Sequence, residues 1–520
     1  MKIELKKYMS KPFVIWPVIL GGALIYFLIG ITHETLWYDE VYSFWMTRYN
    51  FHQIAAYTHA GPPLYYLLLK LFYLILGDSV WALRFLSVLG AVALVGLGAG
   101  PVRRACGDKT AYIYAILTVF TPIMLIMAHE VDRYTLLMFA TTASALYGYL
   151  AARDNKTADW CLFGLFTLAA AYLHYFGLMV VSLINLILLG WILIKKRGRK
   201  KGYIVTAVTI LILYLPWVYA VISQNANVTR ASWIPPADFK LVFGGFFLPY
   251  GYKFFYPGVP RSTSIVLLLT MILIVYGIIV VSIRKDKKNL NIFILTFAVI
   301  LGTFILAAII SKFLTPVFLP RYMLAFFGLI LIALSLSVSL SENRYFITST
   351  VAIYCLLNLF VIINVQTHQF NGPTDKIVSE LEDEIQPGDL IITTEVIVMG
   401  PMLYYFPEAD HFLYLHGPAV KRQYLCKFFE PDVTMDKQQL PALLARHKSF
   451  WLIELKESLQ YYIEALPVDV GEIVGKEKWR QVMETKKYAL PYSQFQFMLS
   501  KYTFGGGGID QQFRDRMVKK

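Results

Sequence analysis

The sequence predicts an all-α polytopic membrane protein of about eleven transmembrane helices, followed by a small extracytoplasmic α/β domain. Composition is the first observation, because the chain is 57% hydrophobic and only 16% charged, whereas soluble domains are roughly 45–50% apolar and about 25% charged. The second is that charge-free apolar runs, each near the ~20 residues that a helix needs to cross a bilayer, recur over residues 12–366. The third is that Lys and Arg residues gather between these runs, as in cytoplasmic loops.

Composition and charge also exclude two classes of function. The net charge of +14 does not indicate nucleic-acid binding, because the positive residues lie in the loops between apolar runs. The four cysteines show no paired spacing, so neither a disulfide framework nor a zinc motif is predicted.

Hydropathy places the predicted helices one by one. The expected spans are residues 12–32, 82–102, 110–128, 134–152, 160–174, 175–194, 203–222, 263–283, 291–311, 322–340 and 345–366. A cleaved signal peptide is the alternative for the first run, but the run is long for one and no small-x-small cleavage site follows it. The run 160–194 is too long for one helix, so its turn "HYFG" at 174–177 should lie at or just beneath the outer surface.

The positive residues predict a cytoplasmic N-terminus. Every second loop is then cytoplasmic, and these loops contain the Lys and Arg residues, as in "KKRGRKKG" at 195–202 and "RKDKK" at 284–288. This pattern requires that "PPLYYLLLKLFYLILG" at 62–77 does not cross. That segment is short for a span and has Lys70 in its middle, so it suits the outer interface better.

After residue 366 the pattern changes from long apolar runs to alternating helix and strand signals. "TDKIVSELEDEI" predicts an amphipathic helix, "QPGD" a turn and "LIITT" a buried strand, while "HFLYL" and "SFWLIEL" predict further strands. We therefore divide the chain into a transmembrane domain at 1–366, an extracytoplasmic α/β domain at 367–503 and a flexible tail at 504–520.

The predicted topology gathers ionisable residues at the outer ends of the helices, where charged groups are costly and indicate function. They are His33, Glu34, Asp39, Glu40, His52, His59, Arg84, His129, Glu130, Asp132, Arg133, His174, Arg230, Lys240, Lys253, Arg261, Lys312 and Arg321. Each has a simpler interpretation: Asp39 and Glu40 as solvated loop charges, His174 as a helix-end histidine, and Arg84 or Arg321 as a snorkelling side chain.

Two of these groups indicate chemistry. "LWYDEVYSFW" surrounds Asp39 and Glu40 with large aromatic residues, which position a carboxylate and shift its pKa. "TPVFLPRYML" places Arg321 at the predicted start of a span, where free N–H groups and a guanidinium suit a phosphate. A carboxylate base and a phosphate site on one face predict glycosyl transfer from a lipid-linked phosphosugar. Transport of such a lipid is the alternative that composition leaves open.

Five stretches resemble the GT-C membrane glycosyltransferases, in particular bacterial relatives of protein O-mannosyltransferases and aminoarabinose transferases (the RgtA/B/C/D-like group). The stretches are "LWYDEVYSFW" at 36–45, "PPLYYLLLKLF" at 62–72 with "ALRFLSVLGA" at 82–91, "AHEVDRYTLL" at 128–137, "YLHYFGLMVV" at 172–181 and "PVFLPRYML" at 316–324. Their order and spacing fit over roughly the first 340 residues, and the domain after 367 lies outside the match.

The resemblance implies an enzyme of the cell membrane that moves a sugar from a polyprenyl-phosphate donor to an extracytoplasmic glycan, lipid or protein, usually with inversion. It implies Asp39 and Glu40 as catalytic carboxylates, with Asp39 as the base, and Arg321, Tyr322 and Lys312 as contacts of the donor phosphate. Further substrate contacts are implied for the residues His59, Tyr65, Arg84, Glu130, Arg133, His174 and Tyr175.

Two departures from the family pattern stand out. Relatives commonly have His directly before the Pro-Pro pair, where this chain has Gly61, with His59 two residues earlier. Relatives also tend to read Glu-Ala-Arg where this chain reads Glu130-Val131-Asp132, so that the Arg is displaced to Arg133. These departures put the roles of His59 and Arg133 in doubt.

Some relatives use a divalent metal and others do not, so the cofactor stays open between none and an ion such as Mg²⁺ or Mn²⁺. Asp39, Glu40, Glu130 and His174 are the candidate ligands for a hard cation. Besides the transferase, two other functions remain at this point: a flippase of lipid-linked sugars and a membrane-anchored binding protein. A transporter should show mid-span charges and paired interrupted helices, and the sequence has no obvious internal repeat.

Overall fold

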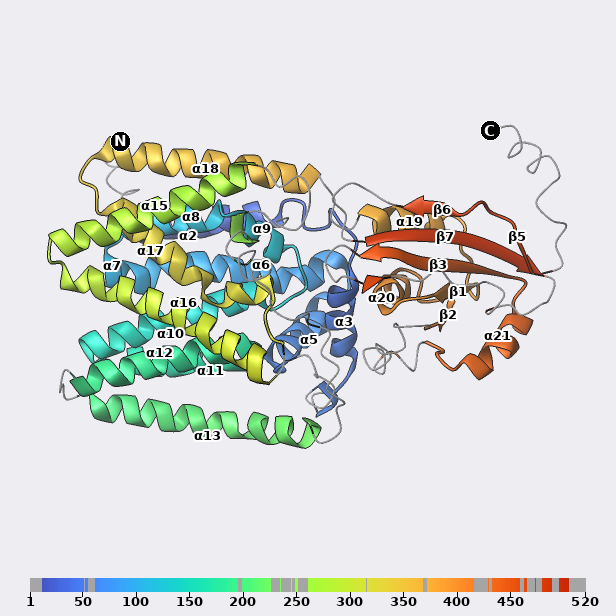
Figure 1. Ribbon diagram of the computed structural model, residues 1–520, viewed down its shortest axis with the longest axis horizontal. Coiled ribbons are helices and arrows are strands. Elements are labelled where there is room, and N and C mark those ends of the chain that lie inside the picture. The colour runs from blue at the N-terminus through green and yellow to red at the C-terminus, as the bar shows by residue number, and fades with distance from the viewer. Residues whose placement is uncertain are drawn as a thin grey trace. The chain divides into compact units, whose positions relative to one another are not determined.

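A computed structural model describes most of the chain, and its contacts divide the described residues into two units (Figure 1). The membrane unit contains the described residues up to Ile31 and from Met46 to Val365, and the C-terminal unit contains Thr32–Trp45 and those from Gln366 on. The described residues are 12–50, 52–54, 61–194, 199–225, 234, 245, 248–250, 261–314, 316–367, 372–415, 429, 433–458, 463–464, 473, 479–488 and 495–504.

The membrane unit is helical because a chain in lipid must satisfy its backbone N–H and C=O groups internally. The longer helices are α6 (Val80–Gly96), α10 (Tyr134–Asp154), α12 (Tyr175–Ile194), α13 (Lys200–Asn225), α15 (Arg261–Ile283), α16 (Lys287–Phe313) and α18 (Arg344–Thr367). The shorter helices are α2 (Pro12–Leu28), α5 (Leu64–Leu76), α7 (Arg103–Cys106), α8 (Asp108–Val119), α9 (Pro122–Ala128), α11 (Thr157–Leu173) and α17 (Phe327–Ser339). The helix α3 (Tyr38–Arg48) begins in the C-terminal unit and ends in the membrane unit. A π-helical turn η1 (Gly98–Val102) and 3₁₀ turns η2 (Leu248–Tyr250) and η3 (Pro320–Phe326) complete it.

The predicted multi-pass architecture is confirmed, but the count of eleven spans is not. In the part of the chain that is described, eight helices are long and apolar enough to cross a membrane, or nine if α8 and α9 form one bent span. The predicted spans 12–32 and 160–174 fall short, because α2 and α11 have 17 residues each. Such a helix is roughly 26 Å long at ~1.5 Å per residue, less than the hydrocarbon core of about 30 Å.

The predicted span 110–128 is broken rather than straight. The axes of α8 and α9 differ by 60°, and the break lies at Thr121, whose backbone is extended (ψ 124°). Pro122 explains the break, because a proline lacks an N–H and disfavours the helical conformation of the residue before it. The Thr121 hydroxyl lies 3.0 Å from the Tyr354 hydroxyl of α18, which satisfies both groups.

The short helix α5 explains the Lys70 charge inside an apolar run. α5 has 13 residues, too few to be counted as a span. This agrees with the charge pattern of the loops, which requires that residues 62–77 do not cross the membrane. Lys70 Nζ donates hydrogen bonds to the carbonyl oxygens of Thr47 (2.7 Å) and Tyr49 (2.6 Å). The ammonium group therefore binds the carbonyls at the C-terminal end of α3, where a positive charge is favourable.

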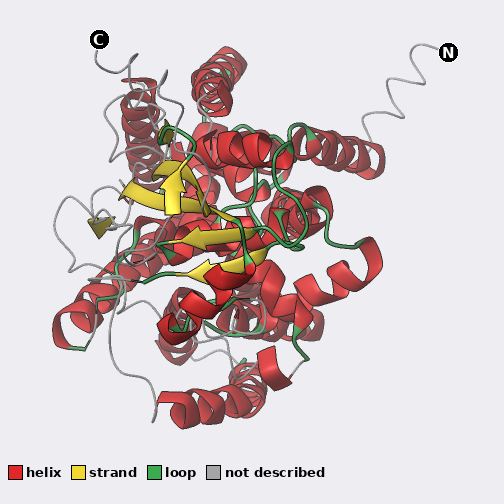
Figure 2. Ribbon diagram, turned by 90° about the vertical axis from the view of Figure 1, so that its right-hand side faces the viewer, coloured by secondary structure: helices red, strands yellow, loops and turns green. Residues whose placement is uncertain are grey.

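The C-terminal unit is an α/β structure around one mixed sheet, whose strands are drawn in yellow in Figure 2. Three parallel strands have the order β2-β1-β3, and β7 and β5 continue the sheet in antiparallel fashion. Its strands are β1 (Leu390–Thr393), β2 (Asp410–Leu413), β3 (Ser449–Ser458), β4 (Ile463–Glu464), β5 (Trp479–Gln481), β6 (Lys486–Tyr488) and β7 (Phe495–Phe504). Its helices are α19 (Gly372–Glu382), α20 (Val396–Tyr405), η5 (Lys437–Gln439) and α21 (Leu440–Arg446). The predicted helix after residue 372 and the predicted strands "LIITT", "HFLYL" and "SFWLIEL" are all present; residues 505–520 of the predicted tail lie outside the description.

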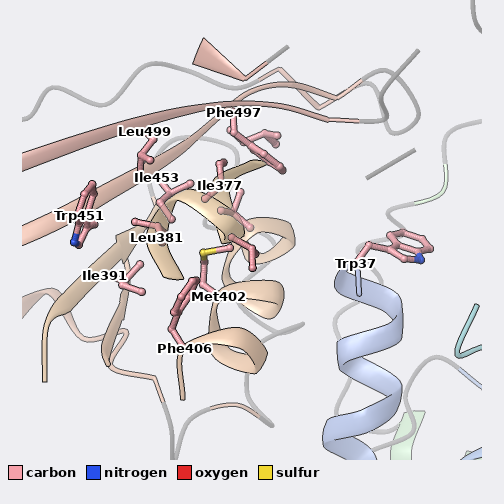
Figure 3. Packing of buried hydrophobic residues seen from close by; sticks show 13 residues of the cluster. Trp37, Ile377, Leu381, Ile391, Met402, Phe406, Trp451, Ile453, Phe497 and Leu499 are labelled. Carbon is pink, nitrogen blue, oxygen red and sulfur yellow. The ribbon is translucent and has the colours of Figure 1, made fainter. Parts of the chain in front are cut away.

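Each face of this sheet has its own hydrophobic core because side chains alternate along a strand. Ile391 and Trp451 face the core that also contains α19 and α20, shown in Figure 3. Ile392 and Phe450 face the other core, which α21 covers. Trp37, from the first predicted loop, belongs to the α19–α20 core and is 3% exposed. The contacts therefore add Thr32–Trp45 to this unit, whereas the boundary at 366 stays a prediction from the sequence.

Candidate active site

His174 lies at the break between α11 and α12 in the membrane unit. Its backbone is extended (φ −160°, ψ 147°), which ends α11 at Leu173, and α12 begins at the next residue. Its side chain is buried, and its ring centre lies 4.7 Å from that of Tyr322 and 6.1 Å from that of Tyr134. The turn thus directs His174 into the bundle, whereas the neighbouring Tyr175 is 37% exposed.

The hydrogen bond and the charges around His174 favour a neutral imidazole. The backbone N–H of Phe176 donates to Nδ1 at 3.0 Å, so Nδ1 supplies a lone pair and the ring proton is on Nε2. Burial lowers the pKa of His174 well below its ordinary value, and the charges of Arg133 and Arg321 lower it further. His174 therefore presents an uncharged N–H donor whose pKa is affected by two nearby guanidinium groups.

Arg133 is held in a fixed orientation by buried partners. Its Nε and its backbone N–H both donate to Asp132 Oδ1, at 3.0 and 2.6 Å, and Nη2 donates to the Tyr66 hydroxyl at 2.6 Å. The remaining nitrogen, Nη1, is buried and has no hydrogen-bond partner among the described residues. An unsatisfied guanidinium N–H in a buried position costs free energy, and an anionic ligand would satisfy it.

Gly61 leaves the space that this guanidinium occupies. A Cβ built on Gly61 would lie 2.9 Å from Arg133 Nη1, closer than such atoms approach in real structures. The two departures from the family pattern are therefore adjacent in the structure. Gly61 has no side chain, and the Arg133 guanidinium occupies the space that a Cβ there would need.

Arg321 and Tyr322 begin the segment that leads into α17. The predicted α-helical start is wrong in detail, because Pro320–Phe326 forms a 3₁₀ helix and the α-helix begins at Phe327. Pro320 stands at the first position of η3, where its missing N–H costs nothing. The Tyr322 ring lies 5.1 Å from the Phe176 ring as well as against His174. Arg321 is half-buried, and its guanidinium rather than an α-helix terminus is the positive group at this position.

Five residues of the membrane unit thus form one cluster, which we call the His174 cluster: Tyr66, Arg133, His174, Arg321 and Tyr322. They come from α5, the loop before α10, the α11–α12 turn and η3. Two guanidinium groups, a neutral imidazole and two phenols match the donors that bind phosphate. This is the arrangement expected of a phosphate site at the predicted outer ends of the helices.

Comparisons with known proteins bear on the fold of the chain. Residues 60–219 match the family model of dolichyl-phosphate-mannose-protein mannosyltransferases. ArnT from Cupriavidus metallidurans in the apo state is similar in structure, with a TM-score of 0.62 at 11% identity over 93% of this chain and 97% of that chain. This chain has the GT-C fold of ArnT. ArnT from the same organism bound to undecaprenyl phosphate matches with a TM-score of 0.58 at 13% identity, over 94% of this chain and 98% of that chain. No curated protein matches the sequence.

The first-loop carboxylates of this GT-C protein belong to the C-terminal unit. Asp39 and Glu40 lie in the first turn of α3. Glu40 is 1% exposed, and its Oε2 accepts a hydrogen bond from the Trp37 backbone N–H at 3.2 Å, as the third residue of a capping box does. Asp39 is half-buried. The two carboxylates therefore differ: Glu40 is buried and caps the helix, whereas Asp39 is half-buried and stays the predicted base.

The other predicted contacts of a GT-C donor or acceptor have different surroundings. Arg84 is buried and donates to the Ile31 carbonyl at 2.8 Å, a structural role at the end of α2. Tyr65 is fully buried with its ring against Tyr66, Glu130 is half-buried and Lys312 is exposed. The predicted residues His59, Arg230, Lys240 and Lys253 lie outside the described residues.

The GT-C resemblance left a divalent metal open. Within the described ranges no group of three His, Cys, Asp or Glu side chains gathers in a way that would hold an ion. The four candidate ligands are divided between the units: Asp39 and Glu40 in the C-terminal unit, Glu130 and His174 in the membrane unit. A divalent metal stays a prediction, and the steps derived below are written for the side chains of this chain.

The sequence does not show the parts of two residues at this site. It predicts Tyr65 rather than Tyr66 as a contact, although "PPLYYLLLK" contains both, because a helical pattern does not show which tyrosine meets Arg133. It gives Asp132 only as one of the outer ionisable residues and as a departure from the family pattern, whereas the structure shows that Asp132 fixes the Arg133 side chain. The signal that could have found both is the position of Arg133 itself, since a buried guanidinium needs several acceptors.

Changing Gly61 to Ala is expected to raise the KM for the lipid-linked donor several-fold. The new Cβ would displace Arg133, which Asp132 and Tyr66 hold in place, and overpacking of this kind costs about 1–3 kcal/mol of stability. Donor KM and the melting temperature in detergent are the measurements. Gly190→Ala is the matched control, because a Cβ at Gly190 meets nothing within 4 Å. Unchanged donor KM in Gly61→Ala would contradict the assignment of Arg133.

His174 is expected to make the folded GT-C protein less stable as the pH falls. The unfolded chain takes up a proton at this residue near pH 6.5, whereas the folded protein takes it up only at a lower pH, because its His174 pKa is lowered. The contribution to the free energy of unfolding is therefore complete above about pH 6.5 and is lost progressively below it. Melting temperatures between pH 5 and 8 should fall more steeply for the native protein than for His174→Gln. Parallel pH curves for the two proteins would rule this out.

Proposed function

We propose that this protein transfers a sugar from a polyprenyl-phosphate donor to an extracytoplasmic acceptor at the cell membrane. The observation that carries the proposal is the His174 cluster, in which a buried histidine packs against Tyr322 and lies within the electrostatic reach of Arg133 and Arg321. Two positive charges around a buried donor group suit a phosphate better than a neutral ligand. Arg133 Nη1 supplies a donor that no described protein group uses.

The comparisons support this function over transport of a lipid-linked sugar. The family model that matches residues 60–219 is that of a sugar-transferring enzyme. One of the similar ArnT structures contains undecaprenyl phosphate, a lipid of the class that the proposed donor would release. The sugar and the acceptor are proposed by class only: a hexose or pentose, and a glycan, lipid or protein of the cell envelope.

The proposed reaction is a single displacement at the anomeric carbon. Asp39 removes the proton from the acceptor hydroxyl while the acceptor oxygen forms its bond to the anomeric carbon. The bond between that carbon and the phosphate oxygen breaks, and its electron pair leaves with the polyprenyl phosphate. Attack from the face opposite the leaving group inverts the configuration of the anomeric carbon. The proton ends on Asp39 and the negative charge on the phosphate.

The side chains of the His174 cluster would act on the leaving group. Arg321 and Arg133 would stabilise the charge that develops on the phosphate, which matters most because the positive groups are fixed before the reaction begins. His174 would donate its Nε2–H to a phosphate oxygen without taking a full charge. Tyr322 packs against His174 and would hold the ring in place. We assign the remaining predicted contacts, Tyr65, Glu130, Tyr175 and Lys312, to the sugar and the lipid headgroup.

The proposal includes the orientation predicted from the loops, with the N-terminus in the cytoplasm and the C-terminal unit outside. In that orientation Asp39, the α11–α12 turn and η3 share the extracytoplasmic side. The division of the positive residues among alternate loops supports this arrangement. Labelling of single cysteines with a membrane-impermeant reagent in intact cells tests it, with modification expected after residue 366 and not in the loop 284–288.

The deciding experiment is sugar transfer by the purified protein in detergent or vesicles. It combines a panel of radiolabelled polyprenyl-phosphate sugars with cell-envelope acceptors, with and without a chelator of divalent metals. Product from one donor, with release of polyprenyl phosphate, is the expected result. Movement of the labelled lipid across vesicles without formation of product would instead identify a transporter.

A further inference from the structure

The segment Thr32–Trp45 carries the proposed base, yet its contacts group it with the C-terminal unit rather than with the membrane helices. Trp37 belongs to the same buried cluster as Met402 and Phe406, at α20 and just beyond it (Figure 3). Further along α3, Phe44 packs edge-on against Tyr404 of α20, with ring centres 5.4 Å apart. The helix that presents Asp39 is thus anchored on α20 through several rings.

The backbone just before Asp39 is fixed by two side chains of the C-terminal unit. The Thr35 N–H donates to Asp375 Oδ1 of α19 at 2.8 Å, and the Leu36 N–H donates to the Tyr405 hydroxyl of α20 at 2.9 Å. The next N–H, that of Trp37, donates to Glu40. Three consecutive N–H groups are therefore satisfied by side chains, which sets the direction in which α3 begins.

Gly400 of α20 lets α3 approach closely. A Cβ at Gly400 would lie 3.2 Å from Tyr38 Cδ2 and 3.6 Å from the Val41 Cβ. Tyr38 directly precedes Asp39, so the residue on each side of the base is held, Tyr38 by packing and Glu40 by its capping bond. A side chain held on both sides has little freedom to leave its position, which is what a general base requires.

We propose that the C-terminal unit sets the position of the base, with Asp375 and Tyr405 as positioning residues that act through Asp39. The proposal rests on the proposed function, in which Asp39 takes the proton of the acceptor. It gives the α/β unit a direct part in the reaction, because α19 and α20 define where α3 starts. Asp375 and Tyr405 bond the backbone just before Asp39, and that backbone carries the base and no predicted contact of the donor. Their loss should therefore affect the chemical step and leave binding of the donor unchanged.

Full-length variants test this. Tyr405→Phe and Asp375→Ala each remove one acceptor from the Thr35–Leu36 backbone, and Asp375→Asn keeps an oxygen that accepts the same hydrogen bond. Tyr488→Phe is the matched control, because its hydroxyl bonds Glu380 within the same unit and does not touch Thr32–Trp45. Two quantities are measured: kcat with donor KM, and the hydrogen exchange of the peptide containing residues 32–45.

Tyr405→Phe and Asp375→Ala are expected to lower kcat by about 10–10²-fold with donor KM unchanged, and to speed exchange in residues 32–45. Asp375→Asn and Tyr488→Phe should retain kcat and the exchange protection. An unchanged kcat in Tyr405→Phe and Asp375→Ala would overturn the proposal. So would an equal loss of kcat in all four variants, since that would reflect general destabilisation.

Failure of the proposed function would be seen separately. Asp39→Asn in the same assays should lose kcat but keep the exchange protection of residues 32–45, because the contacts to Asp375 and Tyr405 are made by the backbone. An active Asp39→Asn protein would remove Asp39 as the base. In that case, slow hydrogen exchange of residues 32–45 in the native protein and faster exchange in Tyr405→Phe would still show that α3 is anchored on α20. A wrong assignment of the base can therefore be distinguished from a wrong assignment of the positioning residues.

Discussion

Replacing Asp39 with Asn is expected to lower kcat for sugar transfer by about 10²–10⁴-fold, the contribution of a general base. The amide cannot accept the proton of the acceptor hydroxyl, whereas its size and its backbone contacts are those of aspartate. Donor KM should change little, because the base acts on the acceptor. The measurement is the steady-state rate with saturating donor, together with the melting temperature, which should stay within a few degrees of that of the native protein.

Glu40→Gln is the matched control for Asp39→Asn. The Gln side chain keeps an oxygen that accepts the Trp37 N–H, so the start of α3 is retained and most activity should remain. Glu40→Ala removes that cap and is expected to cost about 0.5–2 kcal/mol of stability. If Glu40→Gln lost as much activity as Asp39→Asn, the base would have been assigned to the wrong carboxylate.

Replacing Arg321 with Ala is expected to lower kcat by about 10²–10³-fold, the usual effect of removing one group that stabilises developing charge. The phosphate leaves with a negative charge, and Arg321 is one of the two guanidinium groups in the His174 cluster. Arg321→Lys should recover part of the rate, because it restores the charge but not the planar, bidentate geometry. The measurement is kcat and donor KM for both variants.

The control for Arg321 is Arg344→Ala, at the start of α18. Arg344 is exposed, and its guanidinium donates to the neighbouring Tyr345 hydroxyl, so its removal should leave kcat unchanged. The double variant Asp39→Asn with Arg321→Ala adds a second check. When two groups act together on one transition state, the fall in kcat of the double variant is smaller than the product of the falls in the two single variants. Fully multiplicative losses would show that Asp39 and Arg321 contribute independently of each other.

The sequence predicted the helical class well because membrane helices are a local property. An uncharged run of about 20 residues must satisfy its own backbone in lipid, so runs such as 134–152 and 263–283 became α10 and α15. The same reasoning failed at Thr121, where a single residue interrupts a helix without lowering hydropathy, whereas the turn predicted at 174–177 is present at His174. The strands of the C-terminal unit were predictable for a similar reason, since β1 is a short, fully buried apolar run.

The candidate site was predictable only as a set of residue types. The expected phosphate contacts Arg321 and Tyr322 do lie beside His174, but the sequence had put Arg133 in doubt. Its place became evident when the structure put it against Gly61 and Tyr66. The contact between Arg133 and Tyr66 joins the loop before α10 to α5. The residue pattern of one segment does not indicate which other segment it will contact.

The sequence by itself therefore determined that this is a multi-pass helical protein with an appended α/β unit, and that its first loop and a late arginine are the chemical candidates. Only the tertiary structure decided that the loop bearing Asp39 packs on α19 and α20. The two hydrogen bonds that hold it join partners separated by 340 positions (Thr35 and Asp375) and by 369 positions (Leu36 and Tyr405) in the chain. The physical reason is range: apolar periodicity and proline act within a few residues, whereas the partners of Thr35, Leu36 and Arg133 are chosen by packing over the whole chain.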